Sequence, residues 1–503
     1  MGLYRAADVR RIDARLIAAA GGDGYRIMQR AGQAAWKCLN EHWPDTRRLL
    51  VLTGAGNNGG DGWVLARLAR GAGLEVNVLA LRDPGALGGD AAAAARDYLA
   101  AGGAWAPFAA PTADRFTTDS EPQLIADALL GTGLDAAPRD AYAAAIEWAG
   151  RQAAPRLALD VPSGLDADRG STPGVALRAD LTVTFVAAKT GLYTGRGPDL
   201  CGRIVVAPLD ADPAHRTGIA PVAELLTGDA ELPPRPPTTH KGQCGHLLIA
   251  GGRPGMLGAA LLAGRGALRG GAGLVTVLTH RRHAAWIALH RPELMTASWP
   301  PGWRRAGRGV IERATVIALG PGLGQSRWSK SLFRRLAADA RPVVMDADSL
   351  NLLAGKGRTT GAGPPGAPRL LTPHPGEAAR LLGTISAAIE NDRPAAARAI
   401  AQQYQAVTIL KGAGSLIAEP SGRLAVIGHG TPAMAGAGMG DVLTGLAGAL
   451  LAQGLDPWHA ACTAALAHAR AGEVAAAGRD RGLLAGELAD ALPAILAGGT
   501  AAI

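Results

Sequence analysis

The chain has 503 residues, 48% of them hydrophobic and 18% charged, and its formal net charge is +9. This length exceeds one ordinary core and predicts two or three domains, and the composition is that of a globular rather than a disordered protein. The arginines are scattered without a dense basic run, so the charge does not indicate a nucleic-acid partner. No apolar stretch reaches the roughly 18 residues of a membrane span. The four cysteines form no Cys-x-x-Cys pair, which excludes a secreted disulfide framework and favours the cytoplasm.

The first half of the chain alternates between helical and strand patterns. Apolar residues recur at i, i+3 and i+4 from Asp8 to about Trp36, which predicts a helix. Strands are expected at 49–53, 74–80, 124–129, 156–160 and 181–186, with helical stretches between most of them. Such alternation predicts parallel βαβ units in a doubly wound α/β sheet, which binds its ligands at the carboxyl ends of the strands.

A proline-rich stretch at 231–239, Glu-Leu-Pro-Pro-Arg-Pro-Pro-Thr-Thr, interrupts this alternation. It can continue neither helix nor sheet and therefore predicts an extended linker. Beyond it, strands are expected at 245–250, 273–279, 315–319, 342–346 and 407–410, with Ala-rich helices toward the C-terminus. We therefore expect a domain at 1–220, a linker at 221–240 and a second domain at 241–503.

The most informative segment is 54–62, Gly-Ala-Gly-Asn-Asn-Gly-Gly-Asp-Gly, between a predicted strand and a helix expected from Trp63. A glycine-rich turn at a helix N-terminus gathers N–H groups and suits a phosphate. Glycine is expected there because the backbone must take a positive φ or touch the ligand. The asparagines and Asp61 add oxygen acceptors, which suit a ribose hydroxyl or a monovalent cation. A plain turn and helix cap is the simpler alternative, and five glycines argue against it.

Polar residues follow the later strands of this half. Asp127, Asp160 and Lys189 lie at strand ends, Ser163 follows Asp160 closely, and Gly131–Gly133 forms a second glycine turn. A carboxylate at a strand's carboxyl end faces the crevice, where its charge is costly unless it meets a cation or a substrate hydrogen. Each could instead cap the next helix, and for Asp127 alone both interpretations stay open. Together they favour a nucleotide-like ligand.

These motifs, together with Tyr25–Gly32, resemble the epimerase domain of the bifunctional NAD(P)H-hydrate repair enzymes over roughly residues 1–215. The resemblance implies a Rossmann-like domain that interconverts the R and S forms of NADHX and NADPHX, nicotinamide cofactors hydrated at C6. It also implies a K⁺ ion held by Asn58, Asp127 and Ser163.

The substrate contacts implied by the same resemblance lie in the two glycine loops and at one strand end. They are Asn57, Asn58, Gly59, Gly60, Asp61, Gly131, Thr132, Gly133, Leu134, Asp135, Ala136, Ala137 and Asp160. We expect Asp160 to carry out acid–base chemistry. A neighbouring charge from Lys189 is our hypothesis, based on the position of Lys189 at a strand end.

In the second half, Gly436–Asp441 reads Gly-Ala-Gly-Met-Gly-Asp and opens an apolar helix. Stacked glycine N–H groups at a helix start form an anion hole, and the aspartate can remove a proton from a hydroxyl that attacks a nearby phosphorus. The alternative is an Asp N-cap, which does not require three glycines before it. We therefore favour a catalytic role for Asp441.

Other candidates follow further predicted strands. Lys411 is a point cation suited to a phosphate, and His374 lies between two prolines in an extended loop, as a substrate contact would, although a lone histidine is more often structural. Asp346 and Asp348 could hold Mg²⁺ through water or cap the following helix, and both alternatives remain open.

These features resemble the ribokinase-like fold and, within it, the ADP-dependent NAD(P)H-hydrate dehydratases, from about Lys241 to the C-terminus. The segments 251–260 and 270–276 resemble the opening signature of that family, although 253–257 (Arg-Pro-Gly-Met-Leu) departs from the usual Ser and Tyr. The resemblance implies ADP as co-substrate, with Mg²⁺. The implied substrate contacts are Ala259, Gly322, His374 and Asp441, and the implied nucleotide contacts are Lys411, Gly412, Ala413, Gly414, Ser415 and Gly440.

By this likeness Asp441 deprotonates the C6 hydroxyl, the alkoxide attacks the β-phosphorus of ADP, and the resulting phosphate is eliminated. The expected protein is thus a cytoplasmic homo-oligomer that repairs hydrated cofactors and binds neither nucleic acid nor membrane. Two alternatives remain: an ATP-dependent kinase for a vitamin-like alcohol, and a first half that only binds a ligand or a protein.

Overall fold

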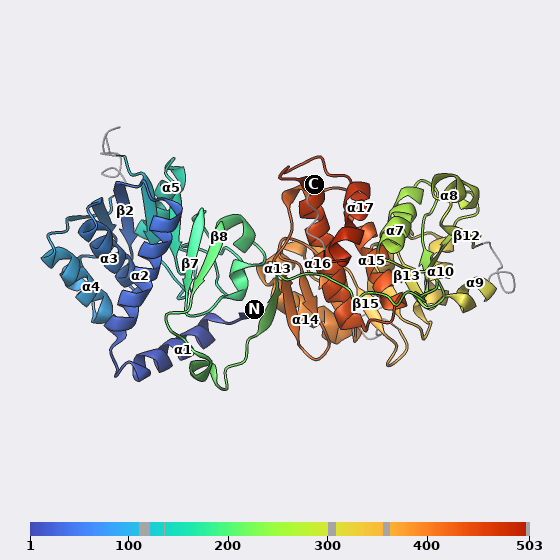
Figure 1. Cartoon of the computed structure of the whole chain (residues 1–503), viewed down its shortest axis with the longest axis horizontal. Helices are drawn as coiled ribbons and strands as arrows, with labels where there is room; N and C mark the ends of the chain where they lie inside the picture. Colours follow the sequence, from blue (N-terminus) through green and yellow to red (C-terminus); the bar gives the residue numbers. More distant parts are fainter. Residues whose placement is uncertain (110–120, 135, 300–307, 356–362, 499–503) are drawn as a thin grey trace. The chain divides into compact units, whose positions relative to one another are not determined.

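The computed structural model describes residues 1–109, 121–134, 136–299, 308–355 and 363–498. The chain divides into two compact units, Gly2–Ala223 and Glu224–Ile503, with Met1 grouped with the second. We call them the N-terminal unit and the C-terminal unit. Each is built on its own sheet with helices packed against it (Figure 1), so the predicted class, two α/β domains, is confirmed.

The sheet of the N-terminal unit is parallel, with the strand order β4-β3-β2-β5-β6-β7-β8. Its strands are β2 (Arg48–Thr53), β3 (Glu75–Ala80), β4 (Trp105–Pro107), β5 (Leu124–Ala128), β6 (Arg156–Leu159), β7 (Leu181–Phe185) and β8 (Arg203–Ala207), preceded by the short β1 (Gly2–Leu3). Its helices are α1 (Ala6–Ala19), α2 (Gly24–His42), α3 (Asn57–Gly71), α4 (Gly89–Ala100), α5 (Asp140–Arg151) and α6 (Gly197–Leu200).

Strand order reverses between β2 and β5, because β3 and β4 lie on one side of β2 and β5 to β8 on the other. Ligands of open parallel sheets bind outside the carboxyl ends of the strands at such a reversal. The two strands remain joined just past their ends, where the Gly54 N–H donates to the Ala128 carbonyl at 3.0 Å. The loops that diverge from this point carry the predicted glycine motifs.

Three details of the N-terminal unit differ from expectation. The pattern over 8–36 forms two helices, α1 and α2, separated by Gly21 and Gly22, whose φ angles of +81° and +87° end the first helix. Helix α3 begins at Asn57 rather than Trp63, so most of the glycine motif is helical. The sequence also does not predict β4 and β8, since both are partly exposed and lack a clear apolar run.

The C-terminal unit has the strand order β9-β18-β17-β16-β15-β14-β13-β10-β11-β12, parallel from β16 to β12 and antiparallel at β17. The strands are β9 (Ala223–Leu226), β10 (His246–Ala250), β11 (Leu274–Thr279), β12 (Met295–Ser298), β13 (Val316–Leu319), β14 (Val343–Met345), β15 (Arg369–Leu371), β16 (Val407–Leu410), β17 (Leu416–Ala418) and β18 (Leu424–Ile427). The predicted linker 221–240 is therefore not wholly a connection, because β9 pairs in parallel with β18.

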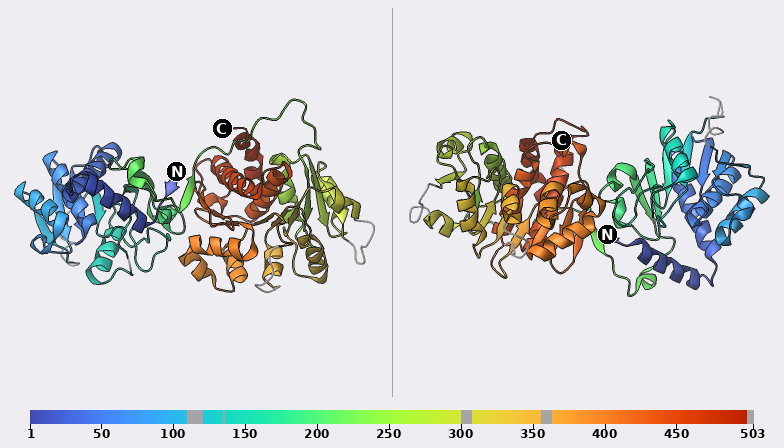
Figure 2. Two further views of the ribbon diagram at one scale, coloured as in Figure 1. Left: turned by 90° about the horizontal axis from the view of Figure 1, so that it is seen from below. Right: turned by 180° about the vertical axis from the view of Figure 1, so that it is seen from behind.

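Helices cover both faces of this sheet: α15 to α17 lie on one face, and α13 and α14 on the other (Figure 2). The helices are α7 (Leu257–Arg269), α8 (Ala284–His290), α9 (Arg308–Arg313), α10 (Arg327–Ala337), α11 (Asp348–Ala354), α12 (Pro375–Leu382), α13 (Ser386–Asn391), α14 (Arg393–Tyr404), α15 (Met439–Ala452), α16 (Pro457–Ala476) and α17 (Ala485–Leu496). Strand order reverses between β10 and β13, which marks the expected ligand crevice.

Helices α7 and α15 pack backbone against backbone. A Cβ atom at Gly445 would overlap the Ala263 carbonyl oxygen, and one at Gly266 would overlap the Val442 carbonyl oxygen. Apart from Asp441 and its neighbour Gly440 in the first turn, almost all of α15 is buried. The helix that carries the Gly436–Asp441 motif is therefore held tightly in the core of its unit.

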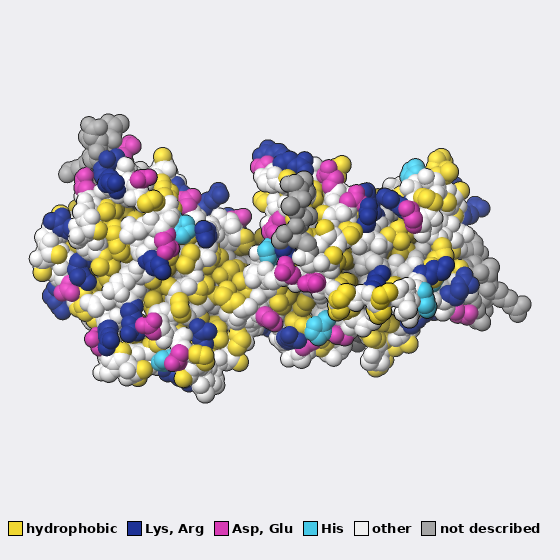
Figure 3. Space-filling view, in the orientation of Figure 1, with side chains coloured by type: hydrophobic (Ala, Val, Ile, Leu, Met, Phe, Trp, Pro, Cys, Tyr) yellow, Lys and Arg dark blue, Asp and Glu magenta, His cyan; other side chains and the backbone are white. Residues whose placement is uncertain are grey.

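On the face shown in Figure 3, lysine and arginine side chains are interspersed with acidic and apolar ones and form no continuous basic surface. This agrees with the scattered arginines of the sequence. A search of the described helices finds none with both the length and the apolar character needed to cross a bilayer.

Candidate active sites

A cavity of about 400 Å³ opens at the strand reversal of the N-terminal unit. Several predicted substrate residues line it, from α3, the loop after β5 and the end of β6: Asn57, Asn58, Asp61, Gly131, Thr132, Gly133 and Asp160. Other lining residues were not singled out from the sequence, among them Arg10, Asp13, Met28, Asp90 and Tyr142. These come from helices α1, α2, α4 and α5, whose side chains reach the cavity only through the tertiary fold.

Some predicted contacts do not line this cavity. Leu134, Ala136 and Ala137 follow Gly133 on the same loop, and Gly59 and Gly60 lie behind the α3 residues that face the cavity; in the described part of the chain none of these five is a lining residue. Asp135 lies outside the described residues.

The glycines of α3 serve close packing rather than positive φ, since the positive-φ residues of the described chain include none of Gly54 to Gly62. A Cβ at Gly59 would overlap the Gly54 carbonyl oxygen, and one at Gly60 would meet the Met28 side chain. Of the two expected reasons for glycine here, positive φ is therefore wrong, and contact with the ligand stays a prediction. The absence of side chains lets α3 begin directly against the β2 loop.

Replacing Gly59 with alanine should therefore destabilise the N-terminal unit by about 2–3 kcal/mol, because the new methyl group meets backbone that cannot move aside cheaply. Thermal unfolding followed by circular dichroism measures this effect. Gly71→Ala is the matched control in the same helix, since a Cβ there meets nothing within 4 Å. Equal melting temperatures for the two variants would contradict the packing role.

Asp127 and Ser163 form a buried pair at the carboxyl ends of β5 and β6. The Ser163 hydroxyl donates to Asp127 Oδ1 at 2.6 Å and its N–H donates to Oδ2 at 2.8 Å. Burial raises the pKa of Asp127, although these hydrogen bonds counteract the rise. Neither residue caps a helix: Asp127 instead holds the loop that contains Ser163.

Asn58 is the unexplained polar residue of this region. Both polar atoms of its side chain, Oδ1 and Nδ2, are buried and find no hydrogen-bond partner among the described residues. A buried amide without partners is costly, so a ligand, ion or water is expected beside it. Asn58 also approaches Asp160 across Gly131, where a Cβ would lie 3.4 Å from the Asn58 side chain and 3.3 Å from Asp160 Oδ2.

Asp160, which lines the cavity and whose side chain is 15% exposed, forms an ion pair with the buried Lys189 behind it. Lys189 Nζ donates to Asp160 Oδ1 at 2.5 Å, to Thr184 Oγ1 at 2.8 Å and to the Phe185 carbonyl at 2.9 Å, and Lys189 is 0% exposed. Asp160 has a φ of +63°, which is uncommon for a residue with a side chain and marks a conformation imposed by the fold. The predicted pairing of Lys189 with the Asp160 region is thus present in the structure.

Asp61 adds a second buried carboxyl group to this cavity. Burial, followed by repulsion from Asp160 and Asp13, raises its pKa well above the usual range. The cavity therefore combines a carboxylate held by an ammonium group with a carboxyl group that favours its protonated form. Buried carboxyl groups with a raised pKa in a cavity are typical of acid–base sites.

The second candidate site lies at the start of α15 in the C-terminal unit. Gly438 takes a φ of +91° before the helix begins at Met439, and Asp441 lies in the first turn. The first N–H groups of a helix have no carbonyl partner within it and carry partial positive charge. A Cβ built on Gly440 would lie 3.2 Å from Lys411 Nζ, so this glycine keeps the approach to the lysine open.

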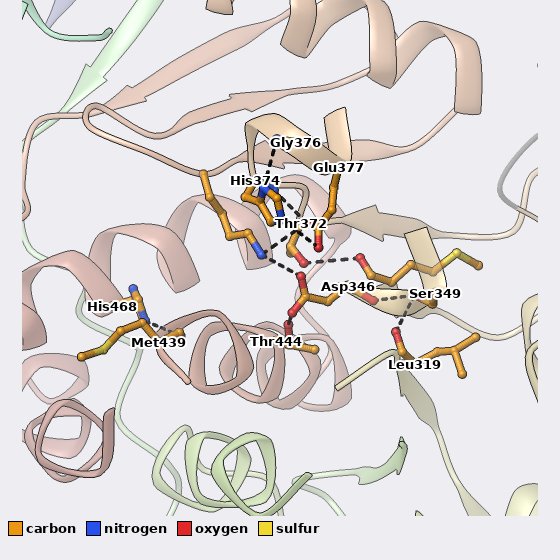
Figure 4. Close-up of polar contacts among 12 residues, drawn as sticks. Leu319, Asp346, Ser349, Thr372, His374, Gly376, Glu377, Met439, Thr444 and His468 are labelled. Carbon is orange, nitrogen blue, oxygen red and sulfur yellow. Dashed lines mark hydrogen bonds and ion pairs between the residues drawn. The ribbon is translucent and has the colours of Figure 1, made fainter. Parts of the chain in front are cut away.

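Lys411, Asp346 and Glu377 form a charged cluster beside α15 (Figure 4). Lys411 Nζ lies 2.7 Å from Asp346 Oδ1 and 3.8 Å from Glu377 Oε2, and Thr444 Oγ1 donates to Asp346 Oδ2 at 2.8 Å. The side chains of Asp346 and Glu377 are only 2% and 6% exposed. Three acidic residues, counting Asp441, lie near one ammonium group, so acidic groups outnumber basic ones in this cluster.

Asp441 is the member of this cluster without a partner: no hydrogen bond or ion pair from the described residues engages its carboxylate. Burial, together with repulsion from Asp346 and Glu377, raises its pKa to about 7, although Lys411 opposes the rise. A carboxylate with a pKa near neutrality is an efficient general base.

His374 is the N-cap of α12. Its Nδ1 accepts from the Gly376 N–H at 3.0 Å, and the His374 N–H donates to Glu377 Oε2 at 2.9 Å. Its ring remains half-exposed, and burial followed by the charge of Lys411 lowers its pKa, so it is neutral at pH 7. His374 thus has the structural role that the sequence left open, and its exposed ring can still meet a ligand.

Ala259 and Gly322 lie side by side at the β10–β13 reversal. A Cβ at Gly322, where φ is +57°, would be 3.1 Å from the Ala259 Cβ, and the Gly252 N–H donates to the Pro321 carbonyl at 2.9 Å. The atypical segment joins this loop, since the Arg253 N–H donates to the Gly322 carbonyl at 2.8 Å.

Lys411–Ser415 turns between the antiparallel strands β16 and β17. Gly412 and Gly414 have φ angles of +142° and +60°, and Ser415 Oγ donates to the Gly412 carbonyl at 3.0 Å, which fixes the turn around Ala413. Asp348 accepts from the Gly324 N–H at 2.7 Å, and neither Asp346 nor Asp348 caps α11.

The sequence analysis does not identify Glu377 or Thr444 as site residues. The only signal for Glu377 is its position three residues after His374, and the only signal for Thr444 is a hydroxyl in an apolar helix. Both signals are weak.

Two sites of this kind, one a cavity lined by carboxyl groups and one a glycine-preceded helix start with a buried aspartate, are typical of a two-domain α/β enzyme. Comparison with known proteins specifies the class. Residues 24–191 match the family model described as YjeF-related protein N-terminus, and residues 247–494 match that of NAD(P)H-hydrate dehydratase. The chain belongs to the bifunctional NAD(P)H-hydrate repair enzymes, so the resemblance drawn from the motifs is confirmed.

Relatives match along the whole chain. The bifunctional NAD(P)H-hydrate repair enzyme Nnr of Escherichia coli (strain K12) is 42% identical over 98% of this chain and 94% of its own length. The enzyme of the same name from Coxiella burnetii is 41% identical, with 97% of each chain covered. A solved structure of the ADP/ATP-dependent NAD(P)H-hydrate dehydratase from Bacillus subtilis, co-crystallized with ATP/Mg2+, is 34% identical and covers 53% of this chain and 94% of that one, with a TM-score of 0.47.

Proposed function

We propose that this chain epimerises (R)- and (S)-NAD(P)HX and dehydrates the S form to NAD(P)H, with ADP converted to AMP and phosphate. The epimerase domain spans residues 1–220 and the dehydratase domain residues 241–503. The observation that carries the proposal is the unpaired Asp441 carboxylate in the first turn of α15, beside Lys411. A site of this kind places a base next to groups that attract a diphosphate.

In the dehydration, Asp441 takes the proton of the C6 hydroxyl and the alkoxide oxygen forms a bond to the β-phosphorus of ADP. The bond from that phosphorus to the bridging oxygen breaks and AMP leaves. The lone pair of the ring nitrogen then expels the C6 phosphate, and loss of a proton from C5 restores the dihydropyridine. Phosphorylation is useful because hydroxide is a poor leaving group and phosphate is a good one.

The first-turn N–H groups of α15 and the Lys411 ammonium group would stabilise the charge that develops on the phosphate oxygens. Ala259, Gly322 and His374 would contact the hydrated nicotinamide, and the Lys411–Ser415 turn with Gly440 would contact the adenine nucleotide. Among the described residues no three acidic, histidine or cysteine side chains converge as a ready-made metal site, so Mg²⁺ would enter with the nucleotide phosphates and be held through water by Asp346 or Asp348. When bound, Mg²⁺ would neutralise charge on the nucleotide phosphates.

For the epimerisation, Asp160 and Lys189 are the proposed catalytic residues. The ammonium group of Lys189 donates to Asp160 Oδ1 and so fixes the orientation of this side chain, which lines the cavity. Asp160 would then exchange a proton with the hydroxyl at C6. The remaining cavity residues, from Asn57 to Asp61 and from Gly131 to Ala137, would hold the nucleotide portion of the substrate.

K⁺ is the proposed ion of this domain, held by Asn58, Asp127 and Ser163. The partnerless, buried Oδ1 of Asn58 supports this assignment, because an amide, a carboxylate and a hydroxyl oxygen suit a cation of low charge density. Bound there, the ion would supply fixed positive charge and order the two loops.

Removal of K⁺ should therefore lower epimerisation about ten-fold or more when it is replaced by tetramethylammonium at equal ionic strength. K⁺ should also raise the melting temperature of the N-terminal unit in proportion to the logarithm of its concentration above the dissociation constant. Dehydration of purified (S)-NADHX is the internal control and should not respond to the exchange at saturating ADP. Identical epimerisation rates in both salts would rule out the ion.

The whole assignment is tested by incubating the purified protein with a mixture of both NADHX epimers, ADP and Mg²⁺, and following each epimer by chromatography. Loss of both epimers is the expected result. Loss of the S epimer alone would mean that the first domain does not catalyse. Loss of neither, together with phosphorylation of a vitamin-like alcohol by ATP, would support the kinase alternative.

We further infer a cytoplasmic homo-oligomer. The cysteines are all free thiols, three of them buried, which suits a reducing compartment. The oligomer is inferred by resemblance, and sedimentation velocity measures it.

A further inference from the structure

Helix α1 forms one wall of the cavity in the N-terminal unit, and the chemistry proposed above does not involve it. Its residues Val9, Arg10, Asp13 and Ile17 all line the cavity. The helix lies before residue 24, where the match to the family model begins.

The position of α1 is fixed by two main-chain contacts. The Tyr4 N–H donates to the Ala188 carbonyl at 2.9 Å, directly beside Lys189, and the Ala6 N–H donates to Asp168 Oδ1 at 2.7 Å. Tyr4 and Ala6 are themselves buried. The α1 wall is therefore anchored to the same strand end that carries the catalytic lysine.

Asp13 is the carboxyl group that this wall presents to the cavity. No hydrogen bond or ion pair formed by the described residues engages its carboxylate. The charged groups that act on it are Asp160, Lys189 and Asp90, and Asp61 is in turn repelled by it. Burial first, then repulsion from Asp160 and Asp90, raises the pKa of Asp13, and Lys189 opposes the rise. Asp13 is therefore a cavity carboxyl group to which the described contacts assign no structural role.

We propose that Asp13 is the second acid–base residue of the epimerase, acting on the C6 oxygen from the α1 wall while Asp160 acts from the end of β6. This inference rests on the proposed epimerase function. Inversion at C6 requires a hydroxyl to leave from one face of the ring and water to add to the other. A single carboxylate serves one face, whereas carboxyl groups on two walls of one cavity serve both.

In the R-to-S direction the Asp13 carboxyl group gives its proton to the leaving hydroxyl. The C6–O bond breaks, water departs, and the nitrogen lone pair forms the N1–C6 double bond of an iminium ion. A second water then bonds to C6 on the opposite face, its proton passes to Asp160, and the electrons of the double bond return to nitrogen. One water leaves and one adds, so atoms and charge balance, and the reverse reaction exchanges the two roles.

Asp13→Asn tests the proposal, with Asp8→Asn as control on the same helix, since Asp8 pairs with Arg11 and is not among the residues that line the cavity. Asp13→Asn should lower epimerisation of purified (R)-NADHX about 100-fold or more and remove one limb of its pH–rate profile. Asp8→Asn should leave the rate within about two-fold, well under the loss expected for a proton-transfer group. Asp13→Glu should recover part of the activity, and wild-type turnover in H₂¹⁸O should place one solvent oxygen at C6.

Dehydration of (S)-NADHX by the same preparations distinguishes the failure modes, because it reports on the other domain. Unchanged epimerisation in Asp13→Asn would overturn the proposal. So would a slower reaction with both pH limbs intact, since that result marks a structural role. Wild-type enzyme that dehydrates the S form but epimerises nothing would instead refute the proposed epimerase function itself.

Discussion

Asp441→Asn should reduce the dehydration of (S)-NADHX about 1,000-fold while nucleotide affinity changes little. Asparagine has nearly the same shape but cannot accept the proton of the C6 hydroxyl. The first-turn N–H groups of α15 and Lys411 remain in place to bind the diphosphate. Single-turnover kinetics measure the first quantity and calorimetric titration with ADP measures the second. Retention of a near-wild-type rate would remove Asp441 from the mechanism.

The same substitution should stabilise the C-terminal unit. The folded-state pKa of Asp441 is about 7 and its ordinary value is 3.8, so the ionised form is disfavoured by folding. The sign follows: the destabilisation is absent below about pH 4, grows as pH rises, and is complete above about pH 7. We expect Asp441→Asn to be more stable than wild type by about 2 kcal/mol at pH 8, after allowance for partial solvent screening, and equally stable at pH 3.5.

Denaturant unfolding at the two pH values measures this difference. Asp480→Asn is the matched control, because Asp480 is 63% exposed and pairs only with its neighbour Arg481. A gain in stability that did not vary with pH would mean that the effect does not arise from ionisation. The wild-type dehydration rate should likewise rise with pH through about 7, as Asp441 loses its proton.

Lys189→Met should abolish epimerisation and destabilise the N-terminal unit by about 3–5 kcal/mol, because it leaves the largely enclosed Asp160 side chain without its ammonium partner. Lys189 is 0% exposed and donates three hydrogen bonds, to Asp160, Thr184 and Phe185. Thermal unfolding and the (R)-NADHX assay measure the two effects. Lys37→Met is the control, since Lys37 is 76% exposed and its pair with Glu41 is long at 3.8 Å.

An unchanged epimerisation rate in Lys189→Met would show that the ion pair has no catalytic role. The double variant Lys189→Met with Asp160→Asn adds information, because it removes the uncompensated charge. It should recover much of the lost stability and none of the activity.

The sequence predicts both crevices because their residues lie at strand ends. A run such as Arg156–Leu159 followed by Asp160 places a polar side chain at the carboxyl edge whatever the remaining packing, so short-range pattern and sheet geometry suffice. The positive φ offered as one reason for the glycines of α3 is wrong. Glycine is required in α3 because a side chain would overlap the Gly54 backbone or the Met28 side chain. These contacts are tertiary, so the local sequence pattern does not reveal them.

Residues whose role depends on tertiary contact were not predictable. Asp13 is one acidic residue among several on an amphipathic helix, and only the packing of α1 brings it to the cavity. Thr444 resembles any small residue of a buried helix, yet its hydroxyl supports Asp346. The helical pattern over 8–36 is confirmed, but periodicity alone does not show the break at Gly21 and Gly22, where backbone conformation ends the first helix.

The glycine seam between α7 and α15 has a further consequence for how the nucleotide is received. Close backbone contacts at Gly445 and Gly266 prevent α15 from rotating or shifting against α7. The partial positive charge at the start of α15 therefore has a fixed direction before any ligand binds. The diphosphate then binds to a preorganised site, and little conformational entropy of the protein is lost on binding. Differences in affinity among nucleotides should accordingly appear in how long each one stays rather than in how fast it enters.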